Sequence, residues 1–248
     1  MSELRVHDLA KSYGGVRALR GVSFSVAAGE IVAMIGPNGA GKSTCFDILN
    51  GQLSPDRGAA ALAGQSLVGK APRQIWRLGV GRTFQITATF DSMTVRENVQ
   101  MALLSHRRRL WSLTSSAARV FAGEADALLE RAGILAQAER PCDVLAYGDL
   151  KRLELAVALA NRPRLLLMDE PTAGMAPPER DALMRLVAGL ARSDGTAVLF
   201  TEHDTDVVFT HADRVLVLAE GKLIAEGSPA TVRADARVRE VYLGSGDA

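Results

Sequence analysis

The sequence predicts an α/β fold in which a helical insert interrupts the core. Strand-like and helix-like segments alternate at both ends of the chain, whereas residues 87–161 show helical periodicity almost throughout. No tandem repeat or low-complexity linker separates the two parts, so we expect the insert to pack on the core. We therefore predict one domain over residues 1–248, with its core in residues 1–86 and 162–248 and its helical subdomain in residues 87–161.

Each predicted strand is a short apolar run that is often rich in β-branched residues. These runs are residues 4–10, 22–26, 30–35, 59–62, 165–168, 197–201, 214–219 and 222–226. Each predicted helix has apolar residues at a spacing of three to four. The helices are residues 42–49, 72–77, 95–105, 117–132, 151–160, 178–191 and 204–211.

The composition excludes several classes of protein. With 248 residues, of which 48% are hydrophobic and 23% charged, the chain has enough apolar material for a full core. The formal net charge of +1 argues against a dedicated nucleic-acid binder. No apolar run approaches the roughly 18 to 20 residues of a membrane span, and the first residues lack the pattern of a signal peptide. We expect a cytosolic protein that reaches a membrane only through a partner.

A glycine-rich segment between a predicted strand and a predicted helix matches the phosphate-binding pattern G-x-x-x-x-G-K-[ST]. Glycines let the backbone curl so that its N–H groups point at phosphate oxygens, and the helix adds the positive end of its dipole. Lys42 supplies a cation for the β- and γ-phosphates, and the Ser43 hydroxyl is a ligand for Mg²⁺. The predicted phosphate-binding residues are Gly36, Pro37, Asn38, Gly39, Ala40, Gly41, Lys42, Ser43 and Thr44.

Two acids, Asp169 and Glu170, follow the apolar run of residues 165–168. A buried strand that ends in acid is typical of one that delivers a carboxylate to a metal ion. We expect Asp169 to hold Mg²⁺ through water and Glu170 to polarise the water that attacks the γ-phosphate. Taken alone, the two acids could instead cap a helix that begins at Pro171, but the upstream phosphate-binding segment favours the nucleotide site.

Five further features stand in order around these motifs, and with them the chain resembles the ATP-binding cassette (ABC) ATPases from residue 4 to about residue 244. Tyr13 lies where that family stacks an aromatic ring on adenine. Gln85 resembles the family's Q-loop glutamine, which senses Mg²⁺ and the γ-phosphate, and His203 resembles its switch histidine. Residues 173–176 correspond to the D-loop. The signature segment, which would open a helix from residue 150 onward, is Leu145, Ala146, Tyr147, Gly148 and Asp149.

The resemblance implies a P-loop NTPase (RecA-like) core, an antiparallel β subdomain and an α-helical insert that carries the signature. It also implies a head-to-tail dimer, because a signature on the insert cannot reach the phosphate-binding segment, or P-loop, of its own chain. Each ATP would lie between the P-loop of one subunit and the signature of the other. Hydrolysis would then move permease helices docked near residues 84–93.

Two departures from the usual family pattern point to a subgroup. Ala146 replaces the signature serine, and Ala176 replaces the D-loop aspartate. The Leu-Ala-Tyr-Gly signature, Glu202 before the switch histidine and the ending of residues 240–244 resemble the ATPases of branched-chain amino acid uptake systems. Cassettes for urea or short amides are similar, so the substrate stays open at this point.

That subgroup implies a peripheral subunit at the cytoplasmic face of the bacterial inner membrane. Its partners would be two permease subunits, a substrate-binding protein acting indirectly, and a second cassette that forms a heterodimer more readily than a homodimer. A soluble ABC ATPase of translation or repair is disfavoured, since those carry two cassettes, a coiled coil or a zinc module. A P-loop kinase or GTPase would leave Gln85, Gly148 and His203 unexplained. The basic run of residues 107–109 is interpreted as a solvated turn, with contact to a permease or lipid as the alternative.

Overall fold

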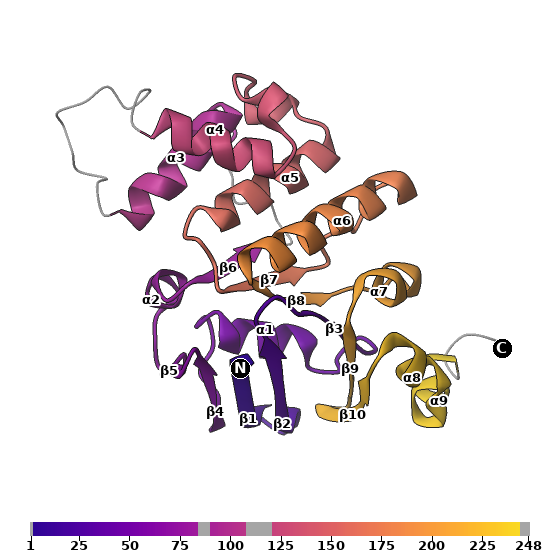
Figure 1. Cartoon of the computed structure of the whole chain (residues 1–248). Coiled ribbons are helices and arrows are strands. Elements are labelled where there is room, and N and C mark those ends of the chain that lie inside the picture. The colour runs from indigo at the N-terminus through magenta and orange to yellow at the C-terminus, as the bar shows by residue number, and fades with distance from the viewer. Residues whose placement is uncertain (1, 84–89, 108–120, 244–248) are drawn as a thin grey trace.

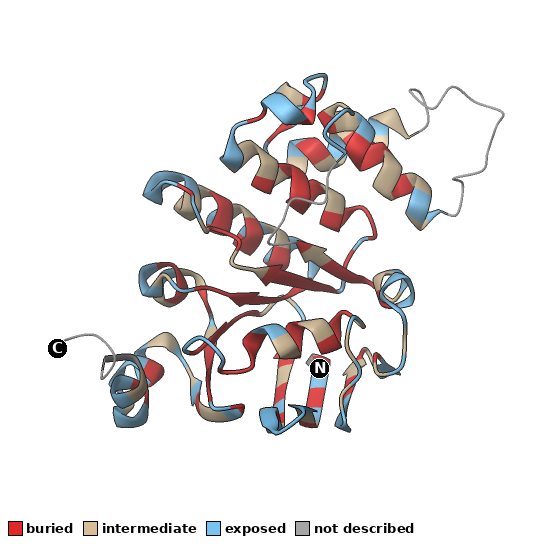
Figure 2. Ribbon diagram, turned by 180° about the vertical axis from the view of Figure 1, so that it is seen from behind, coloured by how far each residue is buried: buried red, intermediate tan, exposed pale blue. Residues whose placement is uncertain are grey.

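The computed structural model describes residues 2–83, 90–107 and 121–243. Two sheets lie one above the other with helices between and around them, and a separate group of helices sits at one end (Figure 1). Buried residues run along the strands and along the inward faces of the helices (Figure 2). The α/β class and the helical insert predicted from the sequence are confirmed.

The smaller sheet is antiparallel, with four strands in the order β2-β1-β4-β5. Its members are β1 (Ser2–Tyr13), β2 (Val16–Ala27), β4 (Arg57–Leu62) and β5 (Gln65–Ser66). β1 and β2 are longer than predicted because they pair as a hairpin out to Tyr13 and Val16. Gly14 makes the tight turn there with a φ of +56°, which glycine adopts without a steric cost.

The larger sheet has six strands in the order β10-β9-β3-β8-β7-β6. They are β3 (Ile31–Ile35), β6 (Val80–Thr83), β7 (Leu165–Asp169), β8 (Ala197–Thr201), β9 (Arg214–Ala219) and β10 (Lys222–Gly227). All neighbouring pairs are parallel except β9 and β10. Every residue of β3 and β8 is buried, which explains why both read as continuous apolar runs.

Helices cover the larger sheet on both faces. They are α1 (Lys42–Leu49), α2 (Pro72–Arg77), α6 (Pro177–Asp194), α7 (Thr205–His211), α8 (Pro229–Ala234) and α9 (Ala236–Leu243). α1 packs between the two sheets, where Phe46 joins Val32 and Leu216 in one hydrophobic cluster. α6 and α7 pack on the opposite face, against alternate residues of the same strands.

The helical group has a hydrophobic cluster of its own. It contains α3 (Val95–His106), α4 (Ala122–Arg131), α5 (Tyr147–Leu159) and the short 3₁₀ segments Leu135–Gln137 and Cys142–Val144. α5 belongs to both parts, since Leu153 faces the helical cluster and Leu155 faces the cluster under α6. An ion pair between Arg131 of α4 and Asp194 of α6 also joins the two parts. Among the described helices, none combines the length and the apolar content that a membrane span requires.

Some predicted elements need correction. β5, β6, α8, α9 and the two 3₁₀ segments were not predicted, and α5 begins at Tyr147 rather than at residue 150 or 151. The helix predicted for residues 117–132 is described from Ala122, and residues 108–120 lie outside the described part of the chain. The remaining elements differ from the predictions only at their ends, which short-range sequence patterns place poorly.

Candidate nucleotide site

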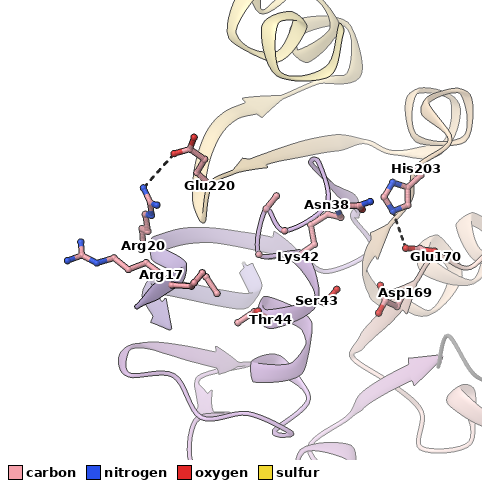
Figure 3. A pocket seen from close by; sticks show the side chains of 15 residues that line it. Arg17, Arg20, Asn38, Lys42, Ser43, Thr44, Asp169, Glu170, His203 and Glu220 are labelled. Atoms are coloured by element: carbon pink, nitrogen blue, oxygen red, sulfur yellow. Dashed lines mark hydrogen bonds and ion pairs between the residues drawn. The ribbon is translucent and has the colours of Figure 1, made fainter. Parts of the chain in front are cut away.

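A cavity of about 430 Å³ opens beside the start of α1 and the ends of β7 and β8 (Figure 3). It draws its lining from β2, the glycine-rich segment, the strand ends and the turn between β9 and β10. Its lining residues are Val16, Arg17, Ala18, Arg20, Asn38, Gly39, Ala40, Gly41, Lys42, Ser43, Thr44, Asp169, Glu170, His203 and Glu220. Most of the predicted phosphate-binding residues, with both strand-end acids and the histidine, therefore meet at one place.

The glycines of the phosphate-binding segment are required by close backbone approaches. A Cβ atom on Gly36 would lie 2.2 Å from the carbonyl oxygen of Leu218, and one on Gly41 would lie 2.5 Å from that of Ala18. Gly41 also has a φ of +105°, a conformation that side chains disfavour. The segment therefore keeps its curled shape, and its backbone N–H groups stay available, only with glycine at these two positions.

Lys42 is buried at the first position of α1 and lies over the glycine-rich segment. Its Nζ donates to the carbonyl oxygens of Gly36 at 2.5 Å and Pro37 at 3.1 Å. Burial lowers the pKa of the Lys42 ammonium, while the carboxylates of Glu170 and Asp169 act in the opposite direction. The lysine is thus a cation placed between carbonyl oxygens and two acids.

Asp169 is the last residue of β7, and both of its carboxylate oxygens face a neighbour. Oδ1 accepts a hydrogen bond of 2.6 Å from the Thr201 hydroxyl on β8. Oδ2 lies 3.8 Å from Nη2 of Arg82, whose Nη1 is 3.2 Å from Asp47 Oδ1 on α1. These contacts fix the carboxylate at the mouth of the cavity, where Ser43 is exposed (Figure 3).

Glu170 and His203 point toward one another from adjacent strand ends (Figure 3), with Glu170 Oε1 3.1 Å from His203 Nε2. Glu170 has a φ of +48°, which is unusual for a residue with a side chain. Its backbone N–H donates to both the carbonyl and the hydroxyl oxygen of Thr201, at 3.1 Å each. Residues 171–174 form a turn and the next helix begins at Pro177, so the two acids do not cap a helix that starts at Pro171.

Several predicted residues are not among those that line the cavity, and within the phosphate-binding segment these are Gly36 and Pro37. Tyr13 is half exposed at the end of β1, and its pairing partner Val16 lines the cavity instead. Gln85 lies outside the described residues.

The signature segment lies apart from the cavity, at the start of α5. Its members lie around the N-cap and first turn of the helix, and none of them lines the cavity. They are Leu145, Ala146, Tyr147, Gly148 and Asp149. A Cβ on Gly148 would lie 3.6 Å from the Glu179 carboxylate of α6, and a Cβ on Gly174 would lie 3.4 Å from the Tyr147 ring. The segment therefore borders residues 173–176.

Sequence reasoning missed Arg17, Arg20 and Glu220 in the cavity wall. Arg20 Nη1 lies 3.7 Å from Glu220 Oε2, and the Arg20 backbone N–H donates to Gly221 O at 2.8 Å. Gly221 N in turn donates to Ala40 O at 3.1 Å, so the β9–β10 turn joins β2 to the phosphate-binding segment. These residues are some 200 positions apart, and no local pattern announces their meeting.

Comparison with known proteins assigns the chain to a family. Residues 19–173 match the family described as ABC transporter. The chain belongs to this family. It is an ATP-binding cassette, the ATPase subunit of a transporter, and the resemblance inferred from the motifs is confirmed. Residues 222–248 additionally match the family described as branched-chain amino acid ATP-binding cassette transporter.

Individual relatives cover almost the whole cassette. It is 39% identical over 250 residues to the high-affinity branched-chain amino acid transport ATP-binding protein LivG of Salmonella typhimurium, with 97% of each chain covered. The solved ADP conformation of MJ1267, an ATP-binding cassette of an ABC transporter, is 32% identical with a TM-score of 0.87, over 99% of this chain and 100% of that one. The dimeric structure of MJ0796, a bacterial ABC transporter cassette, is 25% identical with a TM-score of 0.78, over 91% and 98%.

Proposed function

We propose that this cassette hydrolyses ATP with Mg²⁺ to energise the uptake of branched-chain amino acids. The observation that carries the substrate is the match of residues 222–248 to the branched-chain family, together with 39% identity to LivG across nearly the full length. The substrate proposal rests on relatives, because in this family the cassette does not touch the transported molecule. The chemistry of hydrolysis, in contrast, is argued from residues of this chain.

The cavity has the features that a nucleoside triphosphate with Mg²⁺ requires. A Cβ on Gly36 or Gly41 would clash with the carbonyl oxygen of Leu218 or Ala18, so glycine at both positions keeps the segment curled. The backbone N–H groups of such a curled segment would bind phosphate oxygens. The Ser43 hydroxyl would supply an oxygen ligand of the kind that Mg²⁺ prefers, and the Asp169 carboxylate would accept hydrogen bonds from water bound to the metal. When bound, the metal would neutralise charge that develops on the phosphates during transfer.

Lys42 is the residue we expect to bind the β- and γ-phosphates. Its Nζ would exchange the carbonyl oxygens of Gly36 and Pro37 for phosphate oxygens, which are stronger acceptors because they are charged. Asp169 would receive the metal through water, with its orientation maintained by Thr201. We propose that Tyr13 stacks on adenine and that Gln85 approaches the metal, as the sequence suggests.

Glu170 is the residue we expect to activate water. Its carboxylate would accept the proton of the attacking water, and His203, 3.1 Å away, would hold that carboxylate in place and contact the γ-phosphate. Glu170 has an unusual backbone conformation, and its side chain points toward His203 (Figure 3).

The signature segment would complete the nucleotide site of a second cassette. Ala146 and Tyr147 are exposed, and α5 begins there without a side-chain cap. Its free N–H groups and positive dipole would face the γ-phosphate bound by the partner cassette, even though Ala146 lacks a hydroxyl. We propose a head-to-tail pair, with a heterodimer favoured over a homodimer, and MJ0796 offers a dimeric precedent for the fold.

The wider assembly follows from the family. We propose a peripheral subunit at the cytoplasmic face of the bacterial inner membrane, with two permease subunits and a binding protein that acts indirectly. We also propose the division of the cassette into a core of residues 1–86 and 162–248 and a helical subdomain of residues 87–161. No nucleic-acid partner is proposed, since the net charge of +1 gives no basic surplus.

The test is to isolate the tagged cassette from its native membrane, identify what co-purifies, and measure uptake by the reconstituted complex. We expect a polytopic membrane protein, and uptake of radiolabelled leucine that depends on ATP. Uptake of urea or a short amide without leucine would overturn the substrate proposal. Recovery of the cassette with nucleic acid and without a membrane protein would overturn the proposed role in transport.

A further inference from the structure

Glu202 is a buried acid beside the proposed catalytic pair, with 4% of its surface exposed. It directly follows β8 and precedes His203. Its Oε1 accepts hydrogen bonds from the Thr172 backbone N–H at 2.8 Å and from the Thr172 hydroxyl at 2.6 Å. Its Oε2 accepts from the backbone N–H of His203 at 3.2 Å. Three donors thus converge on one carboxylate.

The bonds of Glu202 join the two loops that carry the catalytic pair. Thr172 lies two residues after Glu170, in the turn where Ala173 N donates to Glu170 O at 3.2 Å. The same turn continues toward residues 173–176, since Met175 N donates to Thr172 O at 3.1 Å. One end of the Glu202 carboxylate therefore holds the loop of Glu170, and the other end holds the backbone of His203.

The loop of Glu170 needs such support because Glu170 itself has a left-handed backbone conformation. A non-glycine residue with a φ of +48° persists only where its surroundings fix it. Thr201 holds its N–H from one side, and Thr172, held by Glu202, fixes the chain that follows. The 3.1 Å contact between Glu170 and His203 depends on both loops keeping this arrangement.

We propose that Glu202 is a positioning residue for ATP hydrolysis. By accepting hydrogen bonds from both Thr172 and the backbone of His203, it keeps His203 in contact with Glu170. The proposal rests on the proposed function, from which it takes the roles of Glu170 and His203. Glu202 does not line the cavity, so it would act on hydrolysis through these neighbours rather than by touching the nucleotide.

The geometry explains why glutamine would be a poor replacement. An amide has the size of the carboxylate but presents one acceptor oxygen and one donor nitrogen. If its nitrogen faced His203, the backbone N–H of His203 would lose its acceptor. If it faced Thr172, the Thr172 backbone N–H would lose its acceptor, although the hydroxyl could turn to accept from the amide. In either orientation the connection between the two loops through residue 202 would be weakened.

The experiment compares four variants of the full-length chain assembled with its permease. They are Glu202→Gln, Thr172→Val, Thr172→Ser, and the double variant that combines Glu202→Gln with Thr172→Val. ATP turnover gives kcat and KM, and equilibrium ATP binding gives Kd. Thr196→Val is the matched control for Thr172→Val, because Thr196 is buried as Thr172 is, with 4% against 1% exposed. Its hydroxyl donates one bond, to Pro163 O at 2.9 Å, away from the cavity. Glu170→Gln is measured in parallel to test the underlying site assignment.

We expect kcat to fall about 10- to 100-fold in Glu202→Gln, with KM and Kd changed less than about threefold, because misplaced catalytic groups slow chemistry more than binding. Thr172→Val should show a smaller fall in kcat, Thr172→Ser should restore it, and the double variant should be no slower than Glu202→Gln. Thr196→Val should lower the melting temperature comparably to Thr172→Val while kcat stays unchanged.

The outcomes separate the two levels of the argument. Wild-type kcat in Glu202→Gln, alongside a collapsed kcat in Glu170→Gln, would overturn the positioning role alone. A proportional loss of kcat in Thr196→Val would also overturn it, since that would reduce the effect to general stability. Wild-type turnover in Glu170→Gln would overturn the proposed site itself.

Discussion

The nucleotide cavity and the signature segment differ in how completely one chain builds them. The cavity draws on β2, the start of α1, two strand ends and the β9–β10 turn. Within it, Glu170 contacts His203, and the charges of Glu170 and Asp169 act on the Lys42 ammonium. The signature segment lies on the exposed start of α5, where Ala146 and Tyr147 face outward and the helix has no side-chain cap. One chain therefore builds the cavity from several elements, whereas the signature segment stays an exposed surface.

This contrast shows that different parts of the fold hold the two halves of the site. Buried parallel strands such as β3 and β8 hold the cavity residues, because both faces of these strands are covered and every one of their residues is buried. The signature segment is held by the separate cluster of the helical group and by its border with residues 173–176. A site divided in this way can be completed by a second chain, and lost with it, without any change in the first half.

The largest expected effect falls on the cavity side. In Glu170→Gln we expect kcat for ATP to fall about 10²- to 10⁴-fold, the usual range for a lost general base, with ATP binding retained. The amide keeps the size of the side chain but cannot accept the proton of the attacking water. Steady-state ATPase assays and calorimetric ATP titration measure the two quantities. Turnover at the wild-type rate would contradict the role assigned to Glu170.

The next effect falls on the signature side and should leave the cavity intact. Ala146→Asp places a carboxylate at the N-cap of α5, where it would face the γ-phosphate of the partner cassette. Because like charges brought together in an interface cost several kcal/mol, we expect ATP-driven association to weaken by about 100-fold or more. Analytical ultracentrifugation with ATP, in the Glu170→Gln background, measures it.

Ala146→Ser is the control for that prediction. It caps the same helix with a neutral hydroxyl, so association should persist. ATP binding to the single chain should be unchanged in both variants. Equal association of Ala146→Asp and the parent would show that residue 146 does not face the partner's nucleotide.

A smaller effect is expected from Lys42→Ala, which removes a cation from the cavity. Charged hydrogen bonds contribute about 1.5 to 3 kcal/mol, so the ATP Kd should rise about 10- to 150-fold. Calorimetric titration measures it, and Lys222→Ala is the control, since Lys222 is an exposed lysine of β10 outside the cavity. Unchanged ATP affinity would remove Lys42 from the phosphate site.

Sequence patterns reached the local parts of this site and stopped where long-range contacts begin. The phosphate-binding segment, Asp169 and Glu170 were predictable because their spacing and flanking apolar runs are contained in a few residues. β6 was missed because Gly81 and Arg82 interrupt its apolar character, and it becomes a strand by pairing with β7. The Glu202–Thr172 and Arg20–Glu220 contacts join residues 30 and 200 positions apart, so only the folded chain brings them together.

The smallest effect tests the region where the two halves of the comparison meet. Ala176 is the N-cap of α6 and has no side-chain acceptor, while the Glu179 carboxylate already accepts from its backbone N–H at 3.4 Å. Ala176→Ser would add a hydroxyl that accepts from the Glu179 N–H, so we expect about 1 kcal/mol of added stability toward unfolding in urea. Ala182→Ser, inside the same helix, should instead destabilise by about 0.5 kcal/mol, since serine is a weaker helix former than alanine. Equal shifts for the two variants would mean that the start of α6 is not held in the capped geometry that places residues 173–176 beside Tyr147.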